Sequence, residues 1–214
     1  MPSIKTLTPI LAGSYYHIFN RGTNRQNIFY TSANYDYFLN LLHKFLSDYV
    51  HFLAYALLPN HFHLVLKIKT ELFIEERGNR SLIEENGSLK SVTDEEQIGR
   101  EVVRQLKRMF ITYAMAINKQ ENRSGNLFDP KYKRLEICDQ SYLEYAIFYT
   151  HFNPEKHGIS NNFRNYKYSS YKAILGNSKT KMDRKLVLDL FGGKESFVDY
   201  HQGWHEERKE ITLE

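Results

Sequence analysis

Cysteine is almost absent from this 214-residue chain, which contains only Cys138. A single cysteine excludes an intramolecular disulfide and is consistent with a reducing cytoplasm. Long apolar runs are also missing. Nothing approaches the 18 consecutive apolar residues of a membrane-spanning helix, and the N-terminal segment lacks the apolar stretch of a signal peptide. We therefore expect an intracellular protein that has no membrane partner.

Aromatic side chains, by contrast, are abundant. Hydrophobic residues make up 42% of the chain, and 16 tyrosines accompany 14 phenylalanines. This is ample material for a folded core, and it excludes a disordered, low-complexity chain. A tyrosine ring can stack on an unpaired base, although most tyrosines serve at the edge of a core.

The spacing of apolar residues predicts the main elements. Strands are expected over residues 15–20, 51–58, 61–68 and 133–138, and helices over 34–49, 99–119 and 140–152. The order strand, helix, strand, strand, helix, strand predicts an α+β fold. This order matches a ferredoxin-like fold, a split βαβ antiparallel sheet with helices packed on one face. In such a sheet the first and third strands are neighbours, which would set His17 beside His61 and His63.

The segment from residue 70 to residue 99 differs in character from its surroundings. It carries eight acidic and three basic residues, three glycines and no clear periodicity. We interpret it as a mobile acidic insertion. The expected organisation is a main domain over residues 1–175, which contains this insertion, and a C-terminal helical tail over residues 176–214.

The strongest local motif runs from Pro59 to Leu66 and contains His61 and His63. Residues two apart on a strand point to the same face, so both imidazoles project together while Phe62 points to the other face. Two neighbouring imidazoles form half of a divalent metal site. Taken alone, the motif is also typical of two partly exposed histidines on a sheet surface.

The second motif is the predicted helix around Tyr113 together with the segment that follows it. From Arg100 to Arg134 there are nine basic and three acidic residues, the charge pattern of a phosphate-binding surface. A tyrosine hydroxyl has an ordinary pKa near 10, so its attack on phosphorus needs the help of a divalent metal. With that help Tyr113 could act as the nucleophile and leave a 5′-phosphotyrosine link and a free 3′-hydroxyl.

Four ordered segments resemble the REP-associated tyrosine transposases, a group within the HUH family of single-strand endonucleases and transposases. The similarity runs from about residue 15 to residue 175. The segments are residues 16–29 (YHIFNRGTNRQNIF), residues 58–64 (LPNHFHL), residues 113–118 with 123–128 (RSGNLF), and residues 149–154 with 168–171 (YSSY).

The resemblance implies cleavage of one DNA strand and strand transfer beside hairpins formed by palindromic repeats, with Mg²⁺ or Mn²⁺ as cofactor. His61 and His63 would be metal ligands and Tyr113 the nucleophile. It also implies a cytoplasmic, nucleoid-associated bacterial protein that acts as a monomer or homodimer. The residues expected to contact single-stranded or hairpin DNA are Arg21, Arg25, Arg104, Lys107, Arg108, Arg123, Lys131, Tyr132, Lys133 and Arg134.

The third metal ligand departs from the family pattern, which places an amide or carboxylate about one helical turn after the nucleophile. Four residues beyond Tyr113 stands Ile117, which cannot bind a metal. Asn118 follows at about 140° around the helix from Tyr113 and could equally cap the helix. His17, through the neighbouring strand, is the alternative ligand.

Two other functions stay open at this point. A nucleic-acid-binding module that has lost catalysis would bind hairpins without needing the histidines. A metal-dependent phosphodiesterase that uses water would need the histidines but not Tyr113. Tyr16, Tyr132 and Tyr142 are alternative nucleophiles.

Overall fold

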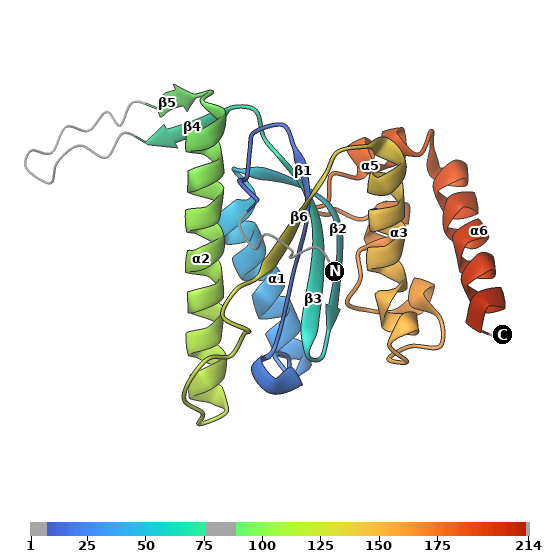
Figure 1. The fold of residues 1–214 in the computed structure, drawn as a ribbon, viewed down its shortest axis with the longest axis horizontal. Helices are drawn as coiled ribbons and strands as arrows, with labels where there is room; N and C mark the ends of the chain where they lie inside the picture. The colour runs from blue at the N-terminus through green and yellow to red at the C-terminus, as the bar shows by residue number, and fades with distance from the viewer. Residues whose placement is uncertain (1–7, 76–88, 213–214) are drawn as a thin grey trace, which may run out of the picture.

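The computed structural model describes residues 8–75 and 89–212. A four-stranded antiparallel sheet forms its centre, with the strand order β2-β3-β1-β6 (Figure 1). This is the strand order of a split βαβ fold, so the predicted fold class is confirmed. The elements of this part are β1 (Tyr15–Arg21), α1 (Ser32–Leu46), β2 (Val50–Leu58), β3 (His61–Ile68), α2 (Glu95–Gln120), β6 (Lys133–Ile137) and α3 (Gln140–Lys156).

One face of the sheet packs on α1 and α2. Alternate residues of β3 (Phe62, Leu64 and Leu66) are fully buried in the core that these two helices complete. A capping box between Thr31 and Asn34 begins α1. The Asp94 side chain accepts a hydrogen bond from the Gln97 backbone and begins α2 earlier than the apolar pattern predicts.

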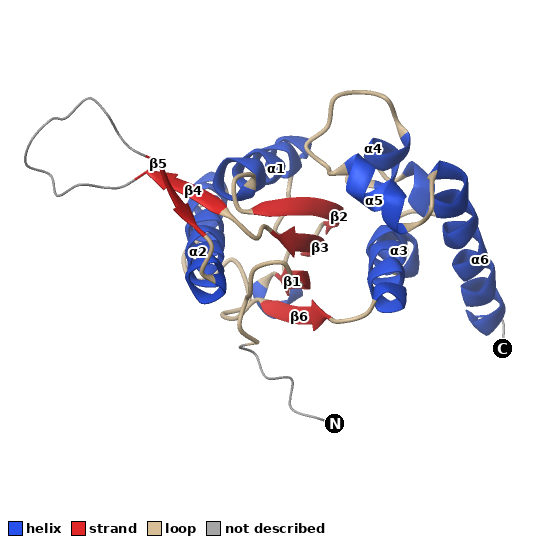
Figure 2. Cartoon of the chain, turned by 90° about the horizontal axis from the view of Figure 1, so that it is seen from above, coloured by secondary structure: helices blue, strands red, loops and turns tan. Residues whose placement is uncertain are grey.

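The other face of the sheet carries a second helical layer (Figure 2). Helix α3 packs on β2 and β3, and a second hydrophobic cluster joins it to the C-terminal helices. Those helices are α4 (Tyr171–Leu175), α5 (Arg184–Leu190) and α6 (Lys194–Thr212). The sheet is therefore enclosed between two layers, and the residues of β3 that alternate with Phe62 face α3.

Two short parts of the predicted insertion pair with each other as a two-stranded ribbon. Strand β4 (Leu72–Glu75) pairs with β5 (Leu89–Val92) in an antiparallel register. The middle of the insertion, residues 76–88, lies outside the described residues, and so does its predicted mobility. In the part of the chain that the structure covers, no helix is both long and apolar enough to cross a membrane.

Candidate active site

Three histidines gather on the face of the sheet that α3 covers. In the antiparallel register of β1 and β3, Phe19 lies opposite His63, and His17 lies two residues further along β1. The His17 Nε2 atom lies 2.9 Å from His63 Nδ1. The ring centroids of His61 and His63 are 5.3 Å apart. The neighbouring strands thus bring the histidines together as the sequence predicted.

The ring of His61 is held by the turn that precedes β3. Its Nδ1 donates to Asn60 Oδ1 over 2.7 Å, while Asn60 Nδ2 donates to the Arg25 carbonyl. Gly22 supports this turn because its backbone N–H donates to the Asn60 carbonyl. A Cβ atom at Gly22 would lie only 2.0 Å from the Gln26 carbonyl oxygen, so the close approach requires glycine. With Nδ1 carrying the proton, Nε2 of His61 is left with a free lone pair.

Burial keeps these imidazoles neutral. It lowers the pKa of His17 to about 4, and together with the charges of His157 and Arg21 it lowers the pKa of His61 to about 4. Burial is also the main cause that depresses the pKa of His63, and the neighbouring His17 adds to it. Neutral imidazoles are the form that binds metal ions.

Helix α3 presents a tyrosine to this histidine group. The ring centroid of Tyr149 lies 6.4 Å from that of His17 and 6.1 Å from that of His63. One face of its ring carries Lys156, whose Nζ lies 4.6 Å from the ring centroid and donates to the Tyr149 hydroxyl over 3.0 Å. At the end of the helix the ring of His157 lies 4.8 Å from that of His61. A phenolic hydroxyl, an ammonium and neutral imidazoles therefore share one location.

His61, His63, Tyr149 and His157 line a cleft of about 260 Å³, which we call the histidine cleft. Its rim is basic and aromatic: Lys133 lies over the ring of Phe19 at 5.8 Å, and Lys131 lines the same rim. Arg21 also lies there, where its Nε forms a 2.7 Å ion pair with Asp129. Cations beside aromatic rings can hold both the phosphates and the bases of a single strand.

Tyr113 does not reach this cleft. It lies in the buried stripe of α2 with Met109 and Ile117, on the opposite side of the sheet, and its side chain is fully buried. Its hydroxyl donates to the Ile28 carbonyl over 2.7 Å, and burial raises its pKa well above 10. The expectation that Tyr113 and the histidines form one site is corrected by this arrangement, because α2 packs on the other face of β3.

Asn118 is separated from the histidines for the same reason. Its Nδ2 donates to the Gly125 carbonyl, and its backbone carbonyl accepts from Arg123. These bonds close the turn after α2, the capping role that was the alternative for this residue. His17 remains beside His63, but its Nε2 is engaged with the His63 ring rather than free for a ligand.

The predicted DNA-contacting residues fall into separate regions. Arg21, Lys131 and Lys133 line the histidine cleft. Arg25 and Arg123 belong to the turns at the same end of the sheet. The remaining five lie on α2, between α2 and β6, or on β6 itself, and none of them lines the cleft. Of these, Arg104 pairs with Glu101, Lys107 lines a groove beside α2, Arg108 covers Phe45, and buried Arg134 bonds the hydroxyl of Tyr132.

Among the described residues, no acidic, cysteine or histidine side chain completes a metal site with His61 and His63. Across residues 8–75 and 89–212, no group of three or more such side chains is arranged to hold a metal ion. An amide is a further oxygen donor, and Asn153 on α3 has one. Its Nδ2 donates to the Tyr149 carbonyl, whereas its Oδ1 is buried without a hydrogen-bond partner. An orphaned oxygen of this kind fits a metal ligand.

The sequence reasoning missed Tyr149 and His157, which line the cleft, and Lys156, which bonds the Tyr149 hydroxyl. One signal could have found them. Asn153 follows Tyr149 by four residues, the spacing expected of an amide ligand after the nucleophile, whereas Ile117 stands in that place after Tyr113. The density of basic residues around Tyr113 outweighed this spacing.

Comparison with solved structures shows similarity to a REP-associated tyrosine transposase bound to a REP hairpin. It superimposes with a TM-score of 0.51 over 82% of this chain and 91% of that chain, at 16% sequence identity. No protein-family model and no curated protein sequence matches the chain. At this identity the similarity establishes a common fold.

Proposed function

We propose that this protein binds hairpin DNA and cuts one strand beside the hairpin, with Tyr149 as the nucleophile. The observation that carries the proposal is the position of the Tyr149 ring about 6 Å from two neutral histidines. The transposase with the same fold is bound to a REP hairpin, which supports the same class of substrate here.

In the proposed reaction the Tyr149 hydroxyl oxygen attacks the scissile phosphorus. An oxygen–phosphorus bond forms to tyrosine while the bond from phosphorus to the 3′-oxygen breaks. The phenolic proton is released, and the departing 3′-oxygen takes up a proton to become a free hydroxyl. Lys156 assists because its ammonium donates to the Tyr149 oxygen and stabilises the negative charge that develops there.

The residues present fit a divalent metal ion, Mg²⁺ or Mn²⁺. His61 and His63 would hold it through their Nε2 atoms, and the orphaned amide oxygen of Asn153 would be the third donor. His63 can do so when its Nδ1–H donates to His17, as a supporting hydrogen bond fixes the tautomer of a ligating imidazole. When bound, the ion would polarise the scissile phosphate and offset its negative charge.

The decisive test compares two tyrosine variants. The protein is incubated with a labelled single-stranded hairpin library and Mn²⁺, and covalent protein–DNA adducts are separated on a denaturing gel. We expect Tyr149→Phe to abolish the adduct and the matched control Tyr113→Phe to retain it. Chelation with EDTA should also abolish the adduct in the wild type. An adduct that persists in Tyr149→Phe would overturn the assignment of the nucleophile.

A second candidate is a hairpin-binding module without catalysis, and the lack of a third histidine, cysteine or carboxylate ligand in the described part of the chain favours it. It predicts that the double variant His61→Ala, His63→Ala binds hairpins as tightly as the wild type and that neither cleaves. Cleavage without a covalent adduct would instead indicate a phosphodiesterase that uses water.

A further inference from the structure

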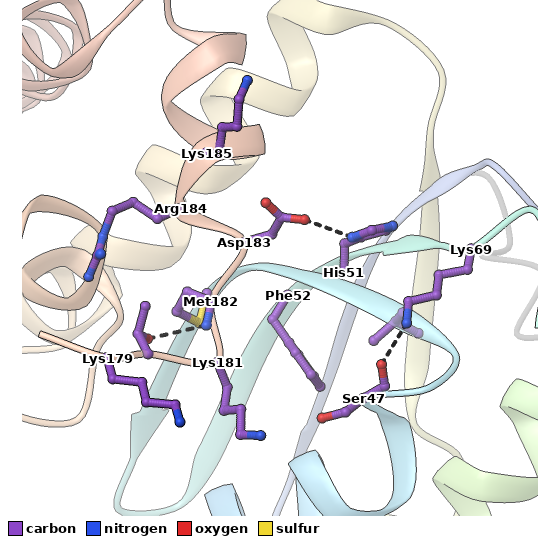
Figure 3. A pocket seen from close by; sticks show the side chains of 12 residues that line it. Ser47, His51, Phe52, Lys69, Lys179, Lys181, Met182, Asp183, Arg184 and Lys185 are labelled. Atoms are coloured by element: carbon purple, nitrogen blue, oxygen red, sulfur yellow. Dashed lines mark hydrogen bonds and ion pairs between the residues drawn. The ribbon is translucent and has the colours of Figure 1, made fainter. Parts of the chain in front are cut away.

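A second cleft, of about 620 Å³, opens at the other end of the sheet (Figure 3). It lies between the start of β2 and the segment that leads into α5. Five cationic side chains line it, whereas Asp183 is its one acidic lining residue. We call it the basic cleft. Its cations are Lys69, Lys179, Lys181, Arg184 and Lys185.

Two of these cations already have partners within the protein. Lys185 pairs with Asp189 at 2.5 Å, and in Figure 3 its side chain points away from Lys179 and Lys181. The Arg184 guanidinium donates to the carbonyls of Ala173 and Ser178. The charge of Lys185 is thus balanced by a carboxylate, and the N–H groups of Arg184 are engaged with main-chain carbonyls.

The one carboxylate is also used locally. One oxygen of Asp183 lies 2.7 Å from His51 Nδ1, and the other accepts from the Leu186 backbone and begins α5. Its charge is therefore directed to these partners rather than to the lysines of the basic cleft.

Three ammonium groups remain available. Lys69 donates one of its three protons to the Ser47 carbonyl, and Lys179 and Lys181 form no ion pair or side-chain hydrogen bond within the described residues. Figure 3 shows Lys179 and Lys181 extending to the same side of the cleft, with Lys69 across from them. The Lys181 charge adds to burial in lowering the pKa of His43 on α1.

The chemistry of the cleft suits phosphate groups rather than bases. Phe52 is the one aromatic ring that lines it apart from His51, and Phe52 is 5% exposed, so it offers no stacking surface. Because the His51 ring is bonded to Asp183 and Phe52 is covered, the unpaired lysines are the groups left to bind a ligand, as in contacts to a nucleic-acid backbone. From these observations we propose that the basic cleft binds the phosphate backbone of duplex DNA, namely the stem of the hairpin.

The position of the cleft sets the length of stem that it requires; this step rests on the proposed function. His51 in the basic cleft and Leu58, which pairs with His61, are seven residues apart on β2. At about 3.3 Å per residue the two clefts are separated by ~23 Å. This separation corresponds to about seven base pairs at 3.4 Å each.

The test measures hairpin affinity by fluorescence anisotropy over a range of salt concentrations. For a stem of about 12 base pairs, we expect the double variant Lys179→Ala, Lys181→Ala to bind roughly 10-fold more weakly at physiological salt. The slope of log K against log salt should fall by about 2, one unit for each lost phosphate contact. A stem of about 4 base pairs should bind both proteins equally, and the matched control Lys185→Ala should behave as the wild type.

Unchanged affinity and slope for the long stem would overturn the proposal. So would loss of binding to polyglutamate with full retention of DNA binding, which would assign the cleft to an acidic protein. The outcome is separable from that of the nuclease reaction. If the wild type forms no adduct but the double variant still loses long-stem affinity, the proposed reaction fails and the basic cleft stands.

Discussion

At the scale of the residue, the direction of each side chain decides its chemistry. Phe62 lies between His61 and His63 in sequence, yet it packs in the core while both histidines line a cleft. Tyr113 and Tyr149 differ in the same way. The first has its hydroxyl bonded to a buried carbonyl, whereas the second has its hydroxyl bonded to an exposed ammonium. The environment of a tyrosine therefore separates Tyr113, which packs in the core, from Tyr149, the nucleophile that we propose.

His17 supplies the prediction that belongs to this scale. Because its ring is the hydrogen-bond partner of His63 Nδ1, His17→Ala leaves His63 free to rotate and to change tautomer. Loss of such a supporting partner typically weakens metal binding by about 10- to 100-fold. Titration calorimetry with Mn²⁺ should show this loss. His51→Ala, at the other end of the sheet, is the control and should bind Mn²⁺ as the wild type does. Equal affinity in His17→Ala would contradict the positioning role.

At the scale of the element, hydrogen bonds join α3 to α6, which packs beside it. His201 Nδ1 donates to the Phe197 carbonyl, so its Nε2 must accept from His151 Nδ1 over 2.9 Å. His151 Nε2 in turn accepts from the Ser170 hydroxyl. Both rings are fully buried. This chain of bonds requires both imidazoles to be neutral. His151 lies on α3, the helix that also carries Tyr149.

The stability of this layer should therefore depend on pH. Burial lowers the pKa of His201 to about 3, and burial together with His201 places the pKa of His151 well below 6.5. The unfolded chain binds these protons first, so stability is complete above about pH 6.5 and is lost as the pH falls toward the folded pKa. Urea denaturation from pH 7 to pH 4 should show this decline.

The variant His201→Gln is the matched comparison, since an amide can keep both hydrogen bonds but does not titrate. Between about pH 5.5 and 4 its free energy of unfolding should fall less steeply than that of the wild type, by up to about 1.4 kcal/mol per pH unit. Parallel pH profiles for the two proteins would show that His201 does not control this dependence.

At the scale of the whole molecule, the two clefts lie at opposite ends of one sheet, and the C-terminal helices belong to the layer beside them. The backbone N–H of Asp183 donates to the Phe52 carbonyl on β2, which joins the segment before α5 to the sheet. His205 on α6 bonds Glu155 on α3 at 2.7 Å. The segment beyond residue 175 thus contributes contacts to both the edge of the sheet and the helix that carries Tyr149.

Removal of α6 should consequently destabilise the whole protein. A chain that ends at Gly193 lacks Phe197, whose burial contributes about 1.5–3 kcal/mol, and loses the His201 and His205 hydrogen bonds at about 1 kcal/mol each. For a protein of this size the midpoint of thermal unfolding should fall by roughly 10 °C. Circular dichroism measures it, with a chain ending at Glu207 as the control. An unchanged midpoint would show that α6 is not required by the fold.

The sequence by itself determined the helices and strands of the central fold, the strand order and the position of His17 beside the histidines of β3. These depend on periodicity and on the few ways in which a split βαβ chain can pair its strands. The acidic insertion was recognised by composition, although its flanking ribbon β4–β5 was not, because two strands of four residues leave too short a pattern.

The tertiary structure alone decided which tyrosine meets the histidines. The strand order allows the helix of Tyr113 or the helix of Tyr149 to cover the histidines. Local sequence does not determine on which face of the sheet a helix packs. Helix α2 packs on the Phe62 face and α3 on the histidine face, so the tyrosine beside the histidines comes from the helix with the less prominent basic pattern. The basic cleft was hidden for the same physical reason. Lys69 lies more than 100 residues before Lys179 and Lys181 in the chain, and the cleft that they share forms only when the segment before α5 packs beside β2.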